Sequence, residues 1–388
     1  MGSRDWRVVG SVTAWQTAAS LCYYTLFAGT ALLREEFGIS RTLVGLVLTA
    51  AMAGYTLTLF PSGAAIDGYG EKRPLLVSLL GLGAMAVAVS FAPSYLLLLV
   101  AAALLGAAYA PAIPGTNRAI LTSVPLARRN LAMGIKQVGV TAGSGGAALL
   151  VNGLAAVYAW QTGFWVVAAV ALLVTLLFVP LYTDDGGDGE AQWPDLRGLG
   201  GDPAYVRLVG AGFFVGAGIF TMTGYTVLYV DEAVGTGVAF AGVVLTVAQV
   251  TGSVGRLGGG ALADRLGGGA QGAGTVMLGQ VALAVLVFGA LAVGVYSPLV
   301  TTALFALLGV SVLGTTGLYY SIMGDLVADE DIGAASAGGQ TAVNSGGLLA
   351  PPLFGLLADS VGYRAGWALL GGCVVAATLL VLDVRRRT

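Results

Sequence analysis

Histidine is absent from this chain of 388 residues, and lysine occurs only twice, at Lys72 and Lys136. Because histidine titrates most readily near neutral pH, any proton chemistry would have to use carboxylates or a bound solute. Cysteine is nearly absent too, since only Cys22 and Cys373 occur, inside apolar runs at opposite ends of the chain. The sequence therefore offers neither a disulfide framework nor a metal site, and no cofactor is expected.

Charge is also scarce. Charged residues make up only 10% of the chain, whereas 57% of its residues are hydrophobic and the mean hydropathy is +0.86. A soluble protein would carry roughly a quarter charged residues, so this composition predicts an integral membrane protein with no nucleic-acid partner. The apolar run after Met1 to Arg7 is too long for a cleavable signal peptide and is expected to stay in the bilayer.

Apolar runs of roughly 20 residues, the length needed to cross a bilayer, recur along the whole chain. We expect twelve membrane-spanning helices, at residues 8–33, 43–66, 74–92, 95–121, 131–158, 160–182, 206–230, 237–262, 275–296, 299–324, 335–358 and 366–382. The 61 glycines suit helices that pack closely in lipid through small side chains. The predicted fold class is an all-α, multi-pass protein of the cell membrane, surrounded by the lipid bilayer.

The stretch from Thr183 to Tyr205, between the sixth and seventh runs, is rich in aspartate and glycine. It is too acidic to enter the membrane, so we expect a cytoplasmic linker at 184–205 between two six-helix halves, 1–183 and 206–388. If the N-terminus is cytoplasmic, most lysines and arginines of the loops also fall on the cytoplasmic side, as the positive-inside rule requires. Both termini are therefore predicted to be cytoplasmic.

Two sequence patterns occur once in each half. The first is a charged loop after the second run, Gly63-Ala-Ala-Ile-Asp67-Gly-Tyr-Gly70-Glu-Lys72-Arg73, with a partial copy after the eighth run, Gly260-Ala-Leu-Ala-Asp264-Arg-Leu-Gly267. The second opens the fifth and eleventh runs, where Gln137 aligns with Gln340 and small residues follow both. These repeats predict that one six-helix unit is present twice.

Two sets of six helices joined by a linker, with the Gly63 to Arg73 loop between helices 2 and 3, resemble the major facilitator superfamily of transporters. The resemblance covers essentially the whole chain. It implies two pseudo-symmetric helical bundles that move a solute by alternating access, and a protein that acts as a monomer. In that family the aspartate of this loop latches the cytoplasmic ends of the two halves. The gating residues implied here are Gly63, Asp67, Gly70, Lys72, Arg73, Arg118, Asp264 and Arg265.

The chemistry of the loop agrees with that role. Gly63 and Gly70 permit close helix approach and a tight turn, and the Asp67 carboxylate can accept hydrogen bonds from the free amides at a helix start. Arg118, late in helix 4, is predicted to form a structural ion pair with the Asp67 region in preference to contacting the solute. A solvated turn that obeys the positive-inside rule would account for the two basic residues, but not for Asp67 or the glycines.

Two cations are expected inside the spans, where ionisable groups are costly and usually functional. Arg256 in helix 8 lies about 12 Å deeper than Asp264 along the helix axis, and its position resembles that of the anion-binding arginine of monocarboxylate and oxalate carriers. An arginine that snorkels to the interface is the alternative. Lys136 in helix 5 lies about 10 Å beyond Arg129. It can contact the solute, be neutral, or pair with Gln137 or a helix carbonyl.

Neutral polar side chains could complete a solute site. Tyrosine combines an apolar ring with one hydroxyl donor, which suits a small organic anion, although packing explains each tyrosine equally well by itself. The substrate-binding candidates beside Arg256 and Lys136 are Tyr23, Tyr24, Gln137, Tyr225, Tyr229, Gln249, Tyr319, Tyr320, Gln340 and Asn344.

Acidic residues lie only at predicted helix ends or in loops, so a cationic solute would find no counter-charge in mid-membrane. The sequence thus predicts a secondary transporter of a small anion, in particular an organic carboxylate, with the proton as the candidate coupling ion. The alternatives are an efflux antiporter for hydrophobic or drug-like compounds and a non-transporting scaffold or receptor. No enzyme activity is expected, because the spans hold no nucleophile, metal cluster or paired acids.

Overall fold

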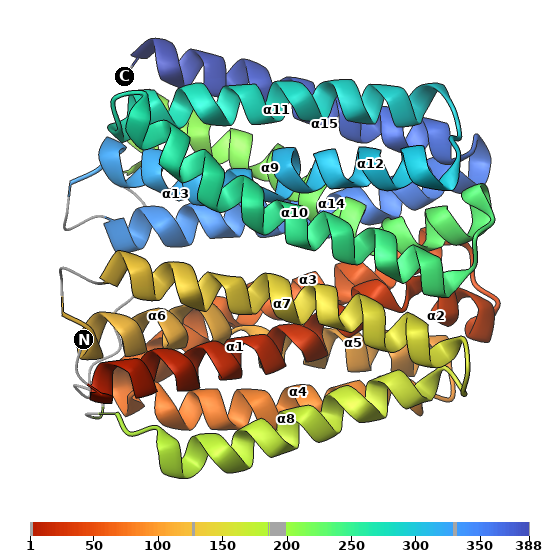
Figure 1. The fold of residues 1–388 in the computed structure, drawn as a ribbon, viewed down its shortest axis with the longest axis horizontal. Coiled ribbons are helices and arrows are strands. Elements are labelled where there is room, and N and C mark those ends of the chain that lie inside the picture. Colours follow the sequence, from red (N-terminus) through yellow and green to blue (C-terminus); the bar gives the residue numbers. More distant parts are fainter. Residues whose placement is uncertain (1–2, 126–128, 185, 187–198, 329–331, 388) are drawn as a thin grey trace. The chain divides into compact units, whose positions relative to one another are not determined.

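The computed structural model describes residues 3–125, 129–184, 186, 199–328 and 332–387. Regular structure in these ranges is helical throughout (Figure 1). Eleven helices of the described part are long and apolar enough to cross a bilayer, and they coincide with the second to twelfth predicted runs. The prediction of an all-α membrane protein is therefore confirmed.

The first predicted span, 8–33, is occupied by two helices, α1 (Ser3–Ala28) and α2 (Thr30–Phe37), which are separated at Gly29. α1 is long enough to cross a bilayer but is not among the eleven apolar helices, because polar residues such as Gln16 and Ser20 interrupt its apolar sequence. Both of these side chains are fully buried. This fits the rule that polar groups at membrane depth face protein and not lipid.

The chain forms two compact units, one of residues 1–37 and 50–193 and the other of residues 38–49 and 194–388. Residues 38–49, which include the start of helix α3 (Arg41–Tyr69), thus pack with the second unit, while the rest of α3 packs with the first. The predicted halves, 1–183 and 206–388, did not anticipate this exchange. Of the predicted linker, 184–205, residues 185 and 187–198 lie outside the described residues.

The helices of the first unit follow one another with short connections. After α3 they are α4 (Lys72–Ser90), α5 (Tyr95–Tyr109), α6 (Ala112–Ser123), α7 (Arg129–Ala155) and α8 (Gln161–Leu181). α5 and α6 together form one span, interrupted near Pro111, which has no amide hydrogen to donate. The Ala107 carbonyl that Pro111 leaves without its usual helical partner accepts a hydrogen bond from the Thr58 hydroxyl at 3.3 Å.

The second unit repeats this order. A short turn, η2 (Leu199–Gly201), precedes α9 (Pro203–Tyr229), the π-helical η3 (Val230–Val234), α10 (Val238–Arg265), α11 (Gly269–Val293), α12 (Pro298–Leu308), the π-helical η4 (Gly309–Leu313), α13 (Thr315–Leu326), α14 (Ile332–Ser360) and α15 (Tyr363–Arg387). η4 interrupts the span formed by α12 and α13, which is the fourth of its unit, as α5 and α6 are in the first. The interruptions thus recur with the duplication.

The two units also share their packing. α1 packs against α7 in the first unit as α9 packs against α14 in the second, and the pair α4 and α8 corresponds to α11 and α15. A Cβ atom at Gly143 in α7 would collide with the Thr17 carbonyl of α1, and one at Gly346 in α14 would collide with the Phe213 carbonyl of α9. Both glycines stand six residues after the aligned Gln137 and Gln340. The small residues of the repeat therefore allow these helices to approach closely.

Candidate solute site and gating loop

The loop from Gly63 to Arg73 contains a tight turn at Gly70. Gly70 has a φ of +76°, in the left-handed region that side chains rarely adopt, and a Cβ there would also collide with the Asp184 carboxylate. The Lys72 amide donates to Asp184 Oδ2 at 3.0 Å, and the Lys72 ammonium donates to the Val179 carbonyl at 3.0 Å. These contacts tie the loop to the C-terminal end of α8, which the sequence did not indicate.

Arg118 in α6 joins the two carboxylates that flank this turn. Its Nη1 lies 3.1 Å from Asp67 Oδ1, and its Nε lies 3.3 Å from Glu71 Oε2. Glu71 is only 2% exposed and also accepts a 2.5 Å hydrogen bond from the Tyr182 hydroxyl. The structure therefore contains the ion pair that was expected between Arg118 and the Asp67 region. Glu71 was not among the predicted gating residues, because its partners Arg118 and Tyr182 come from other segments of the chain.

The other predicted gating residues make fewer contacts. Arg73, Asp264 and Arg265 are exposed, and within the described residues none of the three forms an ion pair. A Cβ at Gly63 would meet no atom within 4 Å. The role of Gly63 in close helix approach therefore stays a prediction.

Arg256 in α10 contacts the interrupted span of the second unit. Its Nε donates to the Leu313 carbonyl at 2.9 Å, at the end of the π-helical η4. A π-helical turn displaces the regular hydrogen bonds of an α-helix, so its carbonyls are available to side-chain donors. Gln280 of α11 contributes in the same way, donating to the Val310 carbonyl at 3.1 Å. Arg256 thus lies at the irregular part of a span, half-buried, and not at the end of its own helix.

Lys136 in α7 is fully buried. Its ammonium donates to Asn117 Oδ1 of α6 at 2.8 Å, and it forms no ion pair with any carboxylate of the described residues. The predicted partner Gln137 points elsewhere, since that residue is exposed. Lys136 is therefore a buried lysine held by a neutral amide.

Three of the predicted neutral residues form one hydrogen-bonded group in the second unit. The Tyr320 hydroxyl of α13 contacts Gln340 Oε1 of α14, and Gln340 Nε2 donates to Asn344 Oδ1 at 2.8 Å. Asn344 is fully buried, yet its Nδ2 has no hydrogen-bond partner among the described residues. This group therefore contains one buried amide donor without a hydrogen-bond partner in the described part of the chain.

The remaining tyrosine candidates are held by packing. Tyr23 is fully buried and stacks on Tyr109 with ring centroids 4.3 Å apart, and Tyr24 meets Tyr23 edge to face at 5.2 Å. Tyr229 lies among aromatic rings, 5.2 Å from Trp367, and the Tyr319 hydroxyl donates to the Gly339 carbonyl at 3.3 Å.

Two further candidates, Gln249 and Tyr225, occupy different surroundings. Gln249 is 4% exposed and precedes Arg256 by seven residues on α10, which places both on one face of that helix. The Tyr225 hydroxyl lies within hydrogen-bond distance of the Arg41 carbonyl at 2.6 Å and of the Pro351 carbonyl at 3.0 Å. Tyr225 is thus engaged near the start of α3 and not in the Gln340 group.

A membrane protein built from two copies of a six-helix unit, with buried polar groups in each copy and interrupted helices beside them, has the architecture of a solute transporter. The comparison with known families agrees. The sequence profile of the Major Facilitator Superfamily matches residues 14–337. The chain belongs to this superfamily, and it is a transport protein and not an enzyme.

Named relatives extend the comparison. The chain is 23% identical to a hexuronate transporter of Bacillus subtilis over 369 residues, which cover 90% of this chain and 87% of that protein. It is 33% identical over 153 residues to a probable sulfoacetate transporter of Cupriavidus necator, covering 39% and 36% of the two chains. It is also 30% identical over 220 residues to a multidrug resistance protein of Proteus mirabilis, covering 53% of each.

The fold has solved counterparts. A bacterial homologue of the human lysosomal transporter Spinster, in an inward-facing and occupied conformation, superposes with a TM-score of 0.81 at 17% identity, over 100% of this chain and 98% of that one. At this level of identity the likeness concerns the fold alone.

Proposed function

We propose that this chain is a secondary transporter that moves a small organic anion across the cell membrane by alternating access. The observation that carries the proposal is Lys136, a fully buried ammonium bonded to a neutral amide at 2.8 Å. A buried charge without a counter-charge is costly, and ionisable groups in membrane spans usually face a solute path or a partner. An anionic solute would supply the missing charge.

The second unit holds two further groups that suit an anion. Arg256 contacts the Leu313 carbonyl at the π-helical turn, and its guanidinium stays charged at any physiological pH. The free Nδ2 of Asn344 suits a carboxylate or hydroxyl oxygen of the solute. The names of two relatives, a hexuronate transporter and a probable sulfoacetate transporter, support a carboxylate-bearing solute.

The described carboxylates lie at or near helix ends, so protein acids at mid-membrane do not compete for these cations. A coupled proton would then travel with the solute, while exchange of one anion for another would need none. We propose that the protein acts as a monomer and that its solute site becomes accessible from each side of the membrane in turn.

Uptake by reconstituted vesicles tests this proposal. The panel consists of labelled glucuronate, sulfoacetate and a monocarboxylate, with a neutral hexose and a cationic dye as comparisons. We expect Lys136→Met and Arg256→Ala each to lower the transport efficiency for the anion by roughly 10- to 100-fold, because a hydrogen bond to a charged group is lost. Arg385→Gln, which removes an exposed arginine of α15, is the matched control.

The outcomes separate solute binding from structure. Methionine has a similar length and no charge, so a lysine that serves packing alone would leave uptake unchanged in Lys136→Met. The proposal is contradicted if only the neutral or cationic compound is transported and both variants move it normally.

Efflux of drug-like compounds is the second candidate, and the multidrug resistance relative favours it. Expression in a host that lacks its own pumps would then raise resistance to hydrophobic cations, and that resistance would survive Lys136→Met.

A further inference from the structure

The start of helix α3 is capped by a side chain from another helix. The first two amides of α3, those of Arg41 and Thr42, donate to Asp359 Oδ1 and Oδ2 at 3.0 and 2.8 Å. The third, of Leu43, donates to the Ser40 hydroxyl at 3.2 Å, and the fourth, of Val44, to the Ser40 carbonyl at 3.0 Å. The last of these is the first regular hydrogen bond of the helix, and the three amides before it, which a helix leaves unpaired, are satisfied by side chains, two of them by the last turn of α14.

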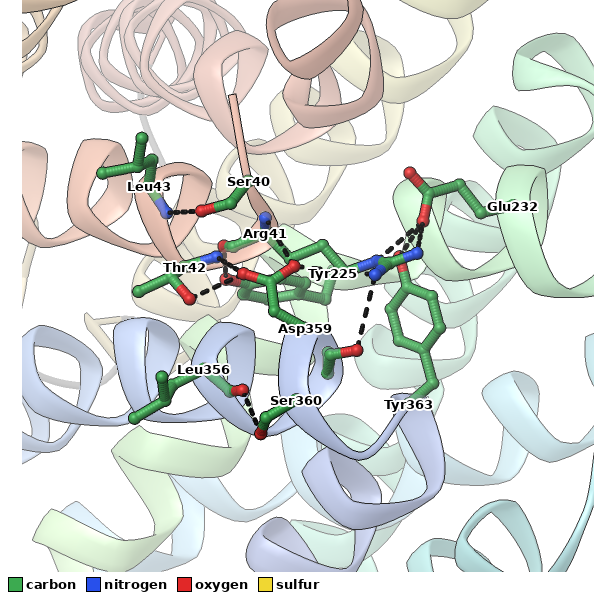
Figure 2. Close-up of polar contacts among 11 residues, drawn as sticks. Ser40, Arg41, Thr42, Leu43, Tyr225, Glu232, Leu356, Asp359, Ser360 and Tyr363 are labelled. Carbon is green, nitrogen blue, oxygen red and sulfur yellow. Dashed lines mark hydrogen bonds and ion pairs between the residues drawn. The ribbon is translucent and has the colours of Figure 1, made fainter. Parts of the chain in front are cut away.

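The Arg41 side chain adds a second connection (Figure 2). Its Nε and Nη2 contact Glu232 Oε2 in η3 at 2.8 and 2.7 Å, and its Nη1 lies 3.5 Å from Asp359 Oδ1. Tyr363, at the start of α15, donates its hydroxyl to the same Glu232 oxygen at 2.7 Å. The guanidinium carbon lies 4.8 Å above the Tyr363 ring, within the range of a cation–π contact. One arginine thus joins three segments of the second unit.

These contacts involve a part of α3 that packs apart from the rest of its helix. Residues 38–49 belong to the second unit and the remainder of α3 to the first. The contact continues for two turns beyond the cap, because the Thr49 hydroxyl donates to the Leu348 carbonyl at 2.6 Å and the fully buried Leu48 lies where a Cβ on Gly224 would be. The first turns of α3 therefore cannot move away from α14 without breaking the hydrogen bonds of the cap.

We propose that Arg41, Thr42, Glu232, Asp359 and Tyr363 form a releasable latch, at the opposite end of α3 from the Gly63 to Arg73 loop. While it is closed, the first turns of α3 are held against α14, and the solute path is shut at this face of the membrane. Opening the path at this face requires the latch to release. The inference rests on the proposed transport cycle, but it can be measured without knowing the solute.

The composition of the latch suits repeated opening. The side chains of Arg41, Glu232 and Asp359 are 25%, 17% and 25% exposed, so water can replace their contacts when they separate. Ion pairs at such exposure are individually weak. The two hydrogen bonds of the helix cap break together, since both are accepted by the carboxylate of Asp359. The closed state is therefore held by several contacts of modest strength.

Accessibility of one engineered cysteine tests the latch. In a cysteine-free background, Leu48→Cys places a thiol at a position that is fully buried while the latch is closed. We expect Asp359→Asn to raise its rate of labelling by a membrane-impermeant maleimide by roughly 2- to 30-fold, because losing a helix cap shifts an equilibrium by this much. Ser360→Ala is the control, since that hydroxyl bonds only to Leu356 of its own helix, at 2.7 Å (Figure 2).

A second variant covers the case in which Asp359→Asn does not fold. Glu232→Gln weakens the Arg41 contact and leaves both capped amides in place, so a smaller increase in labelling is expected. Labelling equal to the parent rate in folded protein of either variant would overturn the proposal. This test compares labelling rates only, so its result does not depend on the side of the membrane from which the maleimide reacts. It also does not depend on the outcome of the solute uptake assay.

Discussion

At the scale of single residues, the buried Glu71 decides what Arg118 does. Arg118 lies between Glu71 and Asp67, at 3.3 and 3.1 Å, and the Glu71 side chain is 3% exposed whereas that of Asp67 is 39% exposed. The pair with Glu71 is therefore less screened by water, and removing one of its partners would leave a buried charge uncompensated. Asp67 is the more solvated partner of Arg118.

We expect Arg118→Ala to lower the free energy of unfolding by about 1–3 kcal/mol, because it leaves the Glu71 carboxylate buried with the Tyr182 hydroxyl as its remaining donor. Thermal unfolding in detergent measures this, with Arg73→Ala as the exposed control. Adding Glu71→Gln should recover part of the loss, since a neutral side chain tolerates burial without a cation. A double variant no more stable than Arg118→Ala would show that the pair is not the cause.

Residue spacing along one helix was readable from the sequence, and contacts between helices were not. Gln340 and Asn344 stand four apart, a spacing that places them on one face of α14, where they bond at 2.8 Å. Their partner Tyr320 and the Asn117 that holds Lys136 come from other helices. Helical periodicity indicates which side chains share a face, but not which helix that face meets.

At the scale of elements, the apolar runs predicted the spans within a few residues. Lipid forces each crossing segment to satisfy its own backbone hydrogen bonds, so a long apolar run has little choice but a helix. The interruptions were harder to predict. Pro111 marks the one between α5 and α6, but the π-helical turns η3 and η4 depend on tertiary contacts and have no comparable sequence signal.

Close helix packing at the repeated glycines can be tested by adding one methyl group. We expect Gly143→Ala to lower the free energy of unfolding by about 1–3 kcal/mol, because the new methyl would overlap the Thr17 carbonyl. Gly153→Ala on the same helix meets no atom within 4 Å and should be neutral or slightly stabilising. Unfolding midpoints in detergent compare the two, and equal values would mean that α1 and α7 can separate without cost.

At the scale of the whole molecule, the duplication was visible in the sequence, and the exchange of residues 38–49 was not. Motif copies after helices 2 and 8 indicated two units, and the shared pairings of α1 with α7 and α9 with α14 agree with them. The assignment of the first turns of α3 to the second unit depends on Asp359 and Glu232, which stand 318 and 191 residues away from Arg41 in the chain. No local pattern reports a contact across such a separation.

The orientation of the whole chain remains a prediction from its basic residues. The run Arg385 to Arg387 ends α15 and the pair Lys72 and Arg73 begins α4, whereas Arg41 and Arg364 stand at the starts of α3 and α15. Basic residues in short loops are retained on the cytoplasmic side, which places the Gly63 to Arg73 loop inside the cell and the Arg41 latch outside. Cysteines placed in loops away from the Gly63 to Arg73 loop and from the Arg41 latch can show which loops face the cytoplasm.

In a cysteine-free background, we expect Val361→Cys, between α14 and α15, to react with an impermeant maleimide in intact cells. Leu266→Cys, between α10 and α11, should react only after the membrane is permeabilised. Both positions are well exposed, at 74% and 53%, so a difference in labelling would report the side of the membrane and not burial. The reverse pattern would place both termini outside and would turn the latch toward the cytoplasm, while leaving its contacts as they are.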